Sequence, residues 1–198
     1  MSFDWNVKTT VPIKVLMDGE PYNLNTKTYR YSLKGNAAAI NPLIVIGLNP
    51  STADEEKPDQ TMKRVVSLME INGFDGFVML NLYPLRTPYP KKLKSIGIDS
   101  EEHKTNLEKI DSCIKYISKP TILLAFGANI AKIKGLANCF KDIVEQCKSY
   151  NPDWCCLDKT KDGHPKHPLF LPEDLRLQDF DIDDYLRKLE ELSLLQHS

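Results

Sequence analysis

Four short segments of this sequence place polar side chains directly after apolar runs. They are residues 47–54, 81–83, 127–129 and 163–169. Their amides and hydroxyls can donate and accept hydrogen bonds, and their carboxylates and imidazoles can also transfer protons. Because the end of a buried strand would otherwise avoid such groups, we expect these segments to form a site for ligand binding or proton-transfer chemistry.

The apolar runs themselves predict the strands that position this site. Residues 43–47 are a continuous apolar run with a proline before it, as expected for a strand buried on both faces. Residues 76–82 and 121–127 have the same character, and residues 154–157 are a shorter fourth candidate. In open parallel sheets the ligand crevice lies beyond the carboxyl ends of the strands, where the polar segments are predicted to converge.

Helical patterns separate the predicted strands. Apolar spacing predicts a helix that opens at Asp59, and another that starts with Ser100 as its cap and ends before Pro120. A third helix is expected at about residues 128–134, and an acidic amphipathic helix at about residues 183–195. This alternation predicts a three-layer α/β/α fold with a central, mostly parallel, four-stranded sheet.

The chain length of 198 residues, with 41% hydrophobic and 27% charged residues, predicts one globular α/β domain. Residues 1–40 are expected to form edge strands and loops, residues 41–172 the core, and residues 173–198 the C-terminal helix. No apolar run approaches the roughly 20 residues of a bilayer span, and the N-terminus lacks the layout of a secretory signal. We therefore expect a cytoplasmic monomer with no membrane partner.

The cysteines and charges limit the possible partners. Five cysteines form an odd set without Cys-x-x-Cys spacing, so we expect reduced thiols that pack in the core. Cys155 and Cys156 would point to opposite faces of a strand, and His164 and His167 with Cys156 would lack a fourth ligand, so no metal is expected. No dinucleotide or phosphate-loop motif is present, and no cofactor is expected. The net charge of −1 means that any contact with DNA must be local.

The polar segments also carry a resemblance. Residues 47–51, Gly-Leu-Asn-Pro-Ser, resemble the water-positioning motif A of the uracil-DNA glycosylase superfamily in its Gly-x-Asn-Pro form. Residues 80–82 resemble its base-reading segment, residues 121–127 its Leu-Leu-x-x-Gly strand, and residues 167–169 its His-Pro motif B, in the same order. The longer signatures Asn-Pro-Ser-Thr-Ala-Asp and His-Pro-Leu look like a bacterial and phage domain-of-unknown-function 1643-like family. The resemblance covers about residues 30–172 and implies a uracil-DNA-glycosylase-like fold.

The resemblance implies hydrolysis of an N-glycosidic bond, in which the departing base gains negative charge. Asn49 would hold the attacking water by its side-chain oxygen, and Asp54 would orient or deprotonate that water. His167 would donate a hydrogen bond to a carbonyl of the base, while His164 could contact phosphate or take over this role. A turn residue is the alternative for Asn49, and a helix cap is the alternative for Asp54.

Three further side chains are candidates for substrate binding. Asn81 could read a pyrimidine edge, Tyr83 could stack on the base, and Arg86 could contact a phosphate or a base substituent. The respective alternatives are a strand-end turn, core packing and a surface arginine. The other candidate contacts are Gly47, Leu48, Pro50, Ser51, Thr52, Gly127, His164 and Lys166.

These expectations together indicate a monofunctional DNA glycosylase that flips a damaged or modified base and leaves an abasic site, in DNA repair or anti-phage defence. Because Ser51, Thr52 and Asp54 replace a bulky wall, the site could admit a pyrimidine enlarged at its C5 position. One alternative is a hydrolase or binding module for a free nucleoside or nucleotide. Another is a non-catalytic interaction protein that docks through its acidic C-terminal helix.

Overall fold

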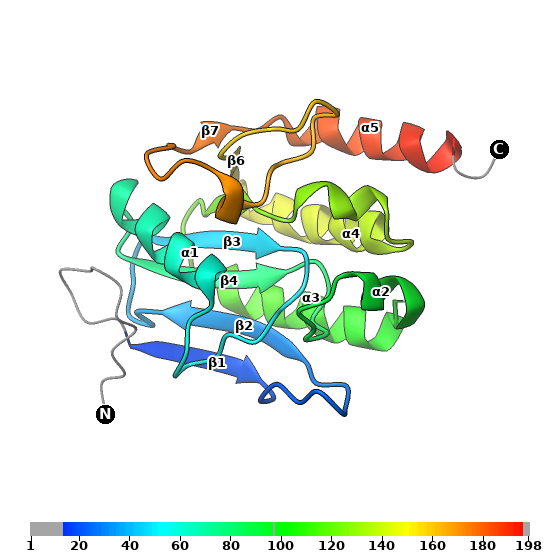
Figure 1. Cartoon of the computed structure of the whole chain (residues 1–198). Helices are drawn as coiled ribbons and strands as arrows, with labels where there is room; N and C mark the ends of the chain where they lie inside the picture. The colour runs from blue at the N-terminus through cyan, green and yellow to red at the C-terminus, as the bar shows by residue number, and fades with distance from the viewer. Residues whose placement is uncertain (1–13, 97, 196–198) are drawn as a thin grey trace.

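The four apolar runs of the sequence form neighbouring strands in a computed structural model that describes residues 14–96 and 98–195 (Figure 1). The strands are β1 (Val15–Gly19), β2 (Arg30–Gly35), β3 (Pro42–Gly47), β4 (Gly76–Asn81), β5 (Thr121–Leu124), β6 (Asp153–Cys156) and β7 (Gln178–Asp179). The helices are α1 (Gln60–Ile71), α2 (Lys91–Ile96), α3 (Ser100–Ile114), α4 (Leu136–Cys147) and α5 (Ile182–Leu195). Short 3₁₀ helices are η1 (Gly127–Ala131), η2 (Lys148–Tyr150) and η3 (Pro168–Phe170).

The sheet has the strand order β1-β2-β4-β3-β5-β6-β7. Strands β4, β3, β5 and β6 are parallel, which confirms the predicted parallel centre, whereas β2 and β7 pair antiparallel with its two edges and β1 pairs antiparallel with β2. The predicted count of four strands is therefore wrong, because the described residues form seven. Strands β1 and β2 lie within residues 1–40, where edge strands were expected, and β7 has only two residues; the side chains of all three are polar or mixed, so they lack the continuous apolar pattern that marks a strand buried on both faces.

Two apolar layers lie on the two faces of this sheet. Along β3, Ile44 and Ile46 pack with residues of α3, α4 and α5, while Leu43 and Val45 pack with residues of α1. This alternation follows from the two-residue period of a strand. The result is the predicted order of layers, with α1 on one face and α3, α4 and α5 on the other (Figure 1).

Strand β3 lies between β4 and β5, the next two strands in the sequence. It pairs with β4 on one side and with β5 on the other, so the strand order reverses there. Loops that leave the carboxyl ends of such strands diverge to opposite faces and leave a crevice between them. The segment after β3 therefore starts at the place in the sheet where a ligand site is most easily built.

The prediction of a helix at about residues 128–134, followed directly by no other, needs a correction. The chain forms the 3₁₀ helix η1 there, and the α-helix α4 begins only at Leu136, after Gly135 with a φ of 92°. Two positive-φ glycines, Gly127 and Gly135, delimit the short turn. The cap of α3 also differs from the prediction, because Asp99 rather than Ser100 accepts the backbone N–H groups of the first turn.

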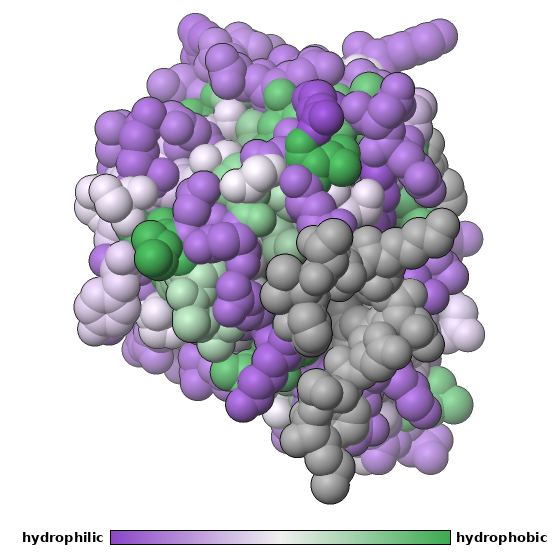
Figure 2. Space-filling view, turned by 90° about the vertical axis from the view of Figure 1, so that its left-hand side faces the viewer, coloured by the Kyte–Doolittle hydropathy of each residue, from purple (hydrophilic) through white to green (hydrophobic). Residues whose placement is uncertain are grey.

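The remaining predictions concern the chain ends, the cysteines and the surface. Residues 1–13 of the predicted N-terminal region lie outside the described residues. All five cysteines are free, and Cys155 and Cys156 enter the two different apolar layers, as predicted for strand neighbours. The face seen from the left of Figure 1 is mostly hydrophilic, with apolar residues in scattered groups where it is coloured (Figure 2).

Candidate functional site

A cavity of about 170 Å³ opens where strands β3 and β5 end. Five predicted site residues line it, and they are Gly47, Leu48, Asn49, Ser51 and His167. Asn129, from the predicted polar segment 127–129, also lines it, as do side chains that the sequence analysis did not select for the site, among them Arg30, Asp59, Thr61 and Phe126. The volume is close to that of a protein cavity of about 150 Å³ that holds one benzene ring, so a single six-membered ring fits it.

The side-chain amide of Asn49 has a fixed orientation. Its Nδ2 donates hydrogen bonds to the carbonyl oxygens of Pro50 at 2.9 Å, Thr87 at 2.8 Å and Leu85 at 3.3 Å. These acceptors require the amide nitrogen on that side, so Oδ1 is the remaining group of the amide. Asn49 therefore offers the cavity a hydrogen-bond acceptor, which is the group needed to hold a water.

His167 caps η3 and enters the cavity from a distant part of the sequence. Its Nδ1 accepts a hydrogen bond from the Leu169 backbone N–H at 3.2 Å, which assigns the ring proton to Nε2. Burial lowers the pKa of His167, while the negative charge of Asp59 opposes this shift. The imidazole is therefore neutral at pH 7 and carries a donor at Nε2.

The loop that carries His167 is held against α1. The helix η3 packs on α1, and Arg64 of α1 donates to the carbonyl oxygens of Pro172 and Glu173 just beyond it. Gly127, with a φ of 69°, lies beside this loop, since a Cβ at Gly127 would stand 3.8 Å from the Cβ of His167. These contacts bring the end of β5 and the His-Pro loop to one place, as the sequence predicted.

Asn81 lies directly behind the floor of the cavity. It pairs with Gly47 across β3 and β4, and its Oδ1 stands 2.9 Å from the position of a Cβ on Gly47. The Asn81 side chain is fully buried, and neither its Oδ1 nor its Nδ2 has a hydrogen-bond partner among the described residues. An unpaired buried amide costs free energy, so this group is suited to a ligand or a water.

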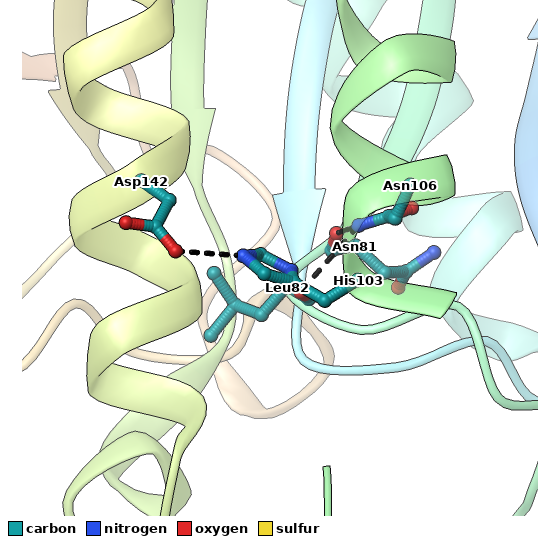
Figure 3. A network of polar contacts seen from close by, with 5 residues as sticks. All are labelled: Asn81, Leu82, His103, Asn106 and Asp142. Atoms are coloured by element: carbon teal, nitrogen blue, oxygen red, sulfur yellow. Dashed lines mark hydrogen bonds and ion pairs between the residues drawn. The ribbon is translucent and has the colours of Figure 1, made fainter. Parts of the chain in front are cut away.

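The backbone of Asn81 is held by a helix on the other face of the sheet. Asn106 of α3 donates through Nδ2 to the carbonyl oxygen of Asn81 at 3.0 Å and approaches that of Leu82 at 3.5 Å (Figure 3). On the same helix, His103 contacts Asp142 of α4 at 2.9 Å and joins the two helices. Asn106 thus fixes the end of β4 from behind.

Asp54, the predicted site carboxylate, does not line the cavity, whereas Asp59, predicted to open a helix, both caps that helix and lines the cavity. Asp54 accepts the backbone N–H groups of Glu56 and Lys57 in a tight turn, and it is not among the cavity residues. Asp59 caps α1 by accepting from Met62 N and lines the cavity. Asp54 therefore stabilises a turn that precedes α1 and does not act as the helix cap that was its alternative, and the carboxylate at the cavity is that of Asp59.

Arg86 is a buried residue of the loop scaffold. Its five N–H groups contact the carbonyl oxygens of Glu20, Ser51, Thr52 and Ala53 and the sulfur of Met17. A guanidinium has five N–H donors, so all of them are used. Arg86 therefore holds residues 51–53 in place beside the cavity and has no donor left for a phosphate.

The aromatic side chain at the cavity is Phe126. Tyr83, the predicted stacking residue, is buried in the core, and its hydroxyl accepts from Asp99 N at 3.0 Å. Burial raises the pKa of Tyr83 to about 12. Phe126 follows β5, lines the cavity and packs edge-on against Phe140 at 5.0 Å between ring centroids. Core packing therefore accounts for Tyr83, and the aromatic ring that lines the cavity is that of Phe126.

Two other predicted residues lie outside the cavity. His164 is buried, and its Nδ1 contacts the hydroxyl of Tyr185 in α5 at 2.8 Å, so it packs the C-terminal helix onto the loop. Lys166 forms an ion pair with Asp158 at 2.6 Å. The two histidines of this loop thus have separate environments, and it is His167 that reaches the cavity.

Thr52 and Pro50 support the cavity through their backbones. The Thr52 side chain is exposed and its carbonyl oxygen accepts from Arg86, while the carbonyl oxygen of Pro50 accepts from the Asn49 amide and from Thr87 N. These two residues therefore shape the loop rather than present side-chain donors to a ligand.

Residues 14–96 and 98–195 contain no group of three or more His, Cys, Asp or Glu side chains that could hold a metal ion. In the same part of the chain, no helix has both the length and the apolar character needed to cross a membrane.

Comparison with known proteins places the chain beside one family. Residues 30–169 match the model of a family described as "Protein of unknown function (DUF1643)". No curated protein matches the chain. A solved structure with a similar arrangement is carboxyl esterase 2 from the mycorrhizal fungus Tuber melanosporum, with 6% sequence identity and a TM-score of 0.36. That match covers 67% of this chain and 42% of the esterase, so it spans less than half of the esterase.

Proposed function

The chain belongs to the DUF1643 family, and we propose that it is a glycosylase that hydrolyses the N-glycosidic bond of a damaged or modified base in DNA. The observation that carries the proposal is that Asn49 and His167 line one cavity with opposite hydrogen-bonding character. An acceptor for water on one residue and a donor for the base on the other are the two groups that this hydrolysis needs.

In the proposed reaction, the oxygen of a water adds to C1′ of the sugar while the bond from C1′ to the base nitrogen breaks. The base leaves with the bonding electron pair and then takes up a proton, so the products are an abasic sugar and the free base. The Asn49 Oδ1 accepts a hydrogen bond from the water, and the carboxylate of Asp59 accepts the proton that the water loses. His167 Nε2 donates to the base carbonyl as negative charge develops.

The cavity favours recognition of one flipped ring. Its volume matches a single six-membered ring, Phe126 supplies an aromatic surface, and the buried amide of Asn81 lies behind Gly47 with its donor and acceptor unpaired among the described residues. An amide in this state suits the edge of a pyrimidine, as the resemblance to uracil-DNA glycosylases implied. Ser51 and Thr61 are small residues in the wall of the cavity.

Base release from oligonucleotides tests the proposal. The substrates carry uracil, a thymine mismatch, or hydroxymethylated or glycosylated cytosine, and abasic sites are detected by strand cleavage in alkali. We expect release from at least one substrate and a loss of about 10²–10³-fold in rate for His167→Ala, the typical cost of losing one such donor. His103→Ala, a histidine substitution away from the cavity, is the control and should retain the rate. If no substrate loses its base, the proposal is wrong.

A second candidate is hydrolysis of a free nucleotide. The net charge of −1 supplies little general attraction to the DNA backbone, and a cavity for one ring does not itself require a polymer. Binding to duplex DNA that weakens as salt rises, together with base release from oligonucleotides but not from mononucleotides, would favour the DNA substrate. The reverse pattern would favour the free nucleotide.

A further inference from the structure

Arg30 is a buried cation at the cavity that the proposed reaction does not use. It begins β2, is only 3% exposed, and lines the cavity together with Asn49 and His167. Its Nη1 donates to the Ala53 carbonyl oxygen at 2.7 Å, while its Nε has no hydrogen-bond partner among the described residues. A buried guanidinium with an unpaired donor is costly, so an acceptor at this position would remove a large penalty.

The charge of Arg30 is not neutralised by a close carboxylate. None of the ion pairs within 4.0 Å among the described residues involves this side chain. Burial and the neighbouring Arg86 lower the pKa of Arg30 to about 10, and the more distant Asp59 and Asp54 oppose this shift. Arg30 therefore remains a cation at neutral pH without a direct counter-ion.

The arrangement of the N–H groups of Arg30 indicates which kind of acceptor can bind it. Nη1 is engaged with Ala53, and Nε, on the edge that it shares with Nη2, has no hydrogen-bond partner among the described residues. Two parallel N–H groups on one edge fit a planar or tetrahedral oxyanion, such as a carboxylate or a phosphate, in two hydrogen bonds. A single carbonyl oxygen would satisfy only one of them.

The surroundings of Arg30 favour an anionic group that belongs to the substrate. The first turn of α1 contributes Thr61 and Met62 to the same cavity, and the Asp59 carboxylate caps this turn by accepting from Met62 N. The anion position of the helix end is therefore taken, and the cation that attracts a ligand anion is Arg30. The cavity therefore has a cationic side at Arg30 and an acceptor side at Asp59.

We infer that Arg30 binds a phosphate group of the nucleotide whose base enters the cavity. This inference rests on the proposed function and adds the group of the substrate that anchors it. The phosphate can be the 5′-phosphate of a free nucleotide or a phosphodiester that flanks a flipped nucleotide in DNA. Both have the same oxyanion chemistry, so the experiment must separate them.

Calorimetric titration of the full chain tests this binding directly. The ligands are the four deoxynucleosides, their 5′-monophosphates, a single-stranded trinucleotide without terminal phosphates, and inorganic phosphate. The proteins are wild type, Arg30→Gln, Arg30→Lys and the control Arg187→Gln, which changes an exposed arginine on α5. We expect at least one phosphate-bearing ligand to bind about tenfold or more tightly than the matching nucleoside, because charge-assisted hydrogen bonds are among the strong ones.

The variants decide whether Arg30 is responsible. Arg30→Gln should abolish the preference for phosphate and leave nucleoside binding unchanged, Arg30→Lys should retain part of it, and Arg187→Gln should match wild type. A preference for monophosphates indicates the free nucleotide, and a preference confined to the trinucleotide indicates DNA. Equal binding of nucleoside and phosphate-bearing ligands by wild type, or a preference that survives in Arg30→Gln, overturns the inference.

The proposed reaction can fail separately. If phosphate-bearing ligands bind through Arg30 but no base is released from any substrate, the inference stands and the glycosylase proposal falls. If base release occurs and Arg30→Gln releases bases from oligonucleotides and mononucleotides at the wild-type kcat/KM, the glycosylase proposal stands and the inference about Arg30 falls. Should Arg30→Gln fold poorly, competition between inorganic phosphate and the nucleotide on wild type still reports the site, and absence of competition contradicts it.

Discussion

Arg30 and Arg86 donate hydrogen bonds to the same carbonyl oxygen, that of Ala53, at 2.7 Å and 2.8 Å. The two buried guanidiniums are therefore neighbours with like charge, and they differ in how many of their N–H donors have a partner. Arg86 satisfies all its donors within the chain, whereas Arg30 keeps its Nε without a partner among the described residues. One arginine supports the loop, and the other faces the cavity.

This difference predicts unequal effects on stability. Arg86→Gln should lower the free energy of unfolding by about 3 kcal/mol or more, because several charge-assisted hydrogen bonds to buried carbonyl oxygens are lost. Arg30→Gln should cost about 1 kcal/mol or less, because one hydrogen bond is lost while a buried, unpaired charge is removed. Urea denaturation followed by circular dichroism measures both. Equal losses would show that Arg30 also supports the loop.

Asn49 allows a prediction about its amide nitrogen. Asn49→Asp replaces an N–H donor with a carboxylate oxygen that faces the carbonyl oxygens of Pro50, Leu85 and Thr87. Repulsion between a negative oxygen and three carbonyl oxygens, of which that of Pro50 keeps Thr87 N as a donor, should cost about 1–3 kcal/mol more than Asn49→Ala, which only removes the donor. Thermal denaturation of the two variants compares them, with Asn25→Asp as an exposed control. An aspartate variant as stable as the alanine variant would contradict the assigned amide orientation.

The parallel centre of the fold could be predicted because each of its strands is a continuous apolar run in the sequence. Edge strands were expected within residues 1–40, where β1 and β2 lie, but their polar or mixed side chains gave no bounds, and β7 was not predicted because it has only two residues, both exposed. Helix α4 carried a clear helical pattern from Leu136 to Cys147 that the prediction at residues 128–134 missed. Gly135 immediately before it was an available signal for where the helix begins.

Part of the site could be predicted because the apolar runs also show where the parallel strands end. The rule that ligands bind beyond parallel strand ends located residues 47–51 and the loop of His167. It could not find Arg30, because this residue reaches the cavity from the antiparallel strand β2. Asp59 did have a signal, as a helix cap beside the predicted crevice. Nothing in the sequence distinguishes the buried Arg86 from a surface arginine.

Gly47 gives a test of the cavity floor. A Cβ at this position would meet Met79 Cε at 2.6 Å and Asn81 Oδ1 at 2.9 Å, so Gly47→Ala overpacks the floor. We expect a loss of about 1–3 kcal/mol in stability and a loss of substrate binding. Gly76→Ala is the matched control, because its Cβ would meet Ala39 at 2.5 Å at the opposite end of β4. Similar loss of binding in both variants at a temperature where both are folded would count against this location of the site.

His167 predicts how the site responds to pH. Its Nδ1 accepts from Leu169 N, and a proton on Nδ1 would place two donors against each other. Burial lowers its pKa, and Asp59 opposes that shift, so the folded protein binds this proton at lower pH than the unfolded chain. Stability from this group is therefore complete above about pH 6.5 and is lost as the pH falls below it, by at most about 1.4 kcal/mol per pH unit.

The same ionisation should shape the rate of the proposed reaction. We expect kcat/KM to fall on the acid side of neutrality, as neutral His167 is lost, and His167→Gln to be slower but without that fall. Denaturation at pH 7.5 and 5.5 should show a smaller loss of stability for His167→Gln than for wild type. His164 also has a pKa lowered by burial, but it is present in both proteins, so their difference reports His167. An acid limb that persists unchanged in His167→Gln would assign the ionisation to another group.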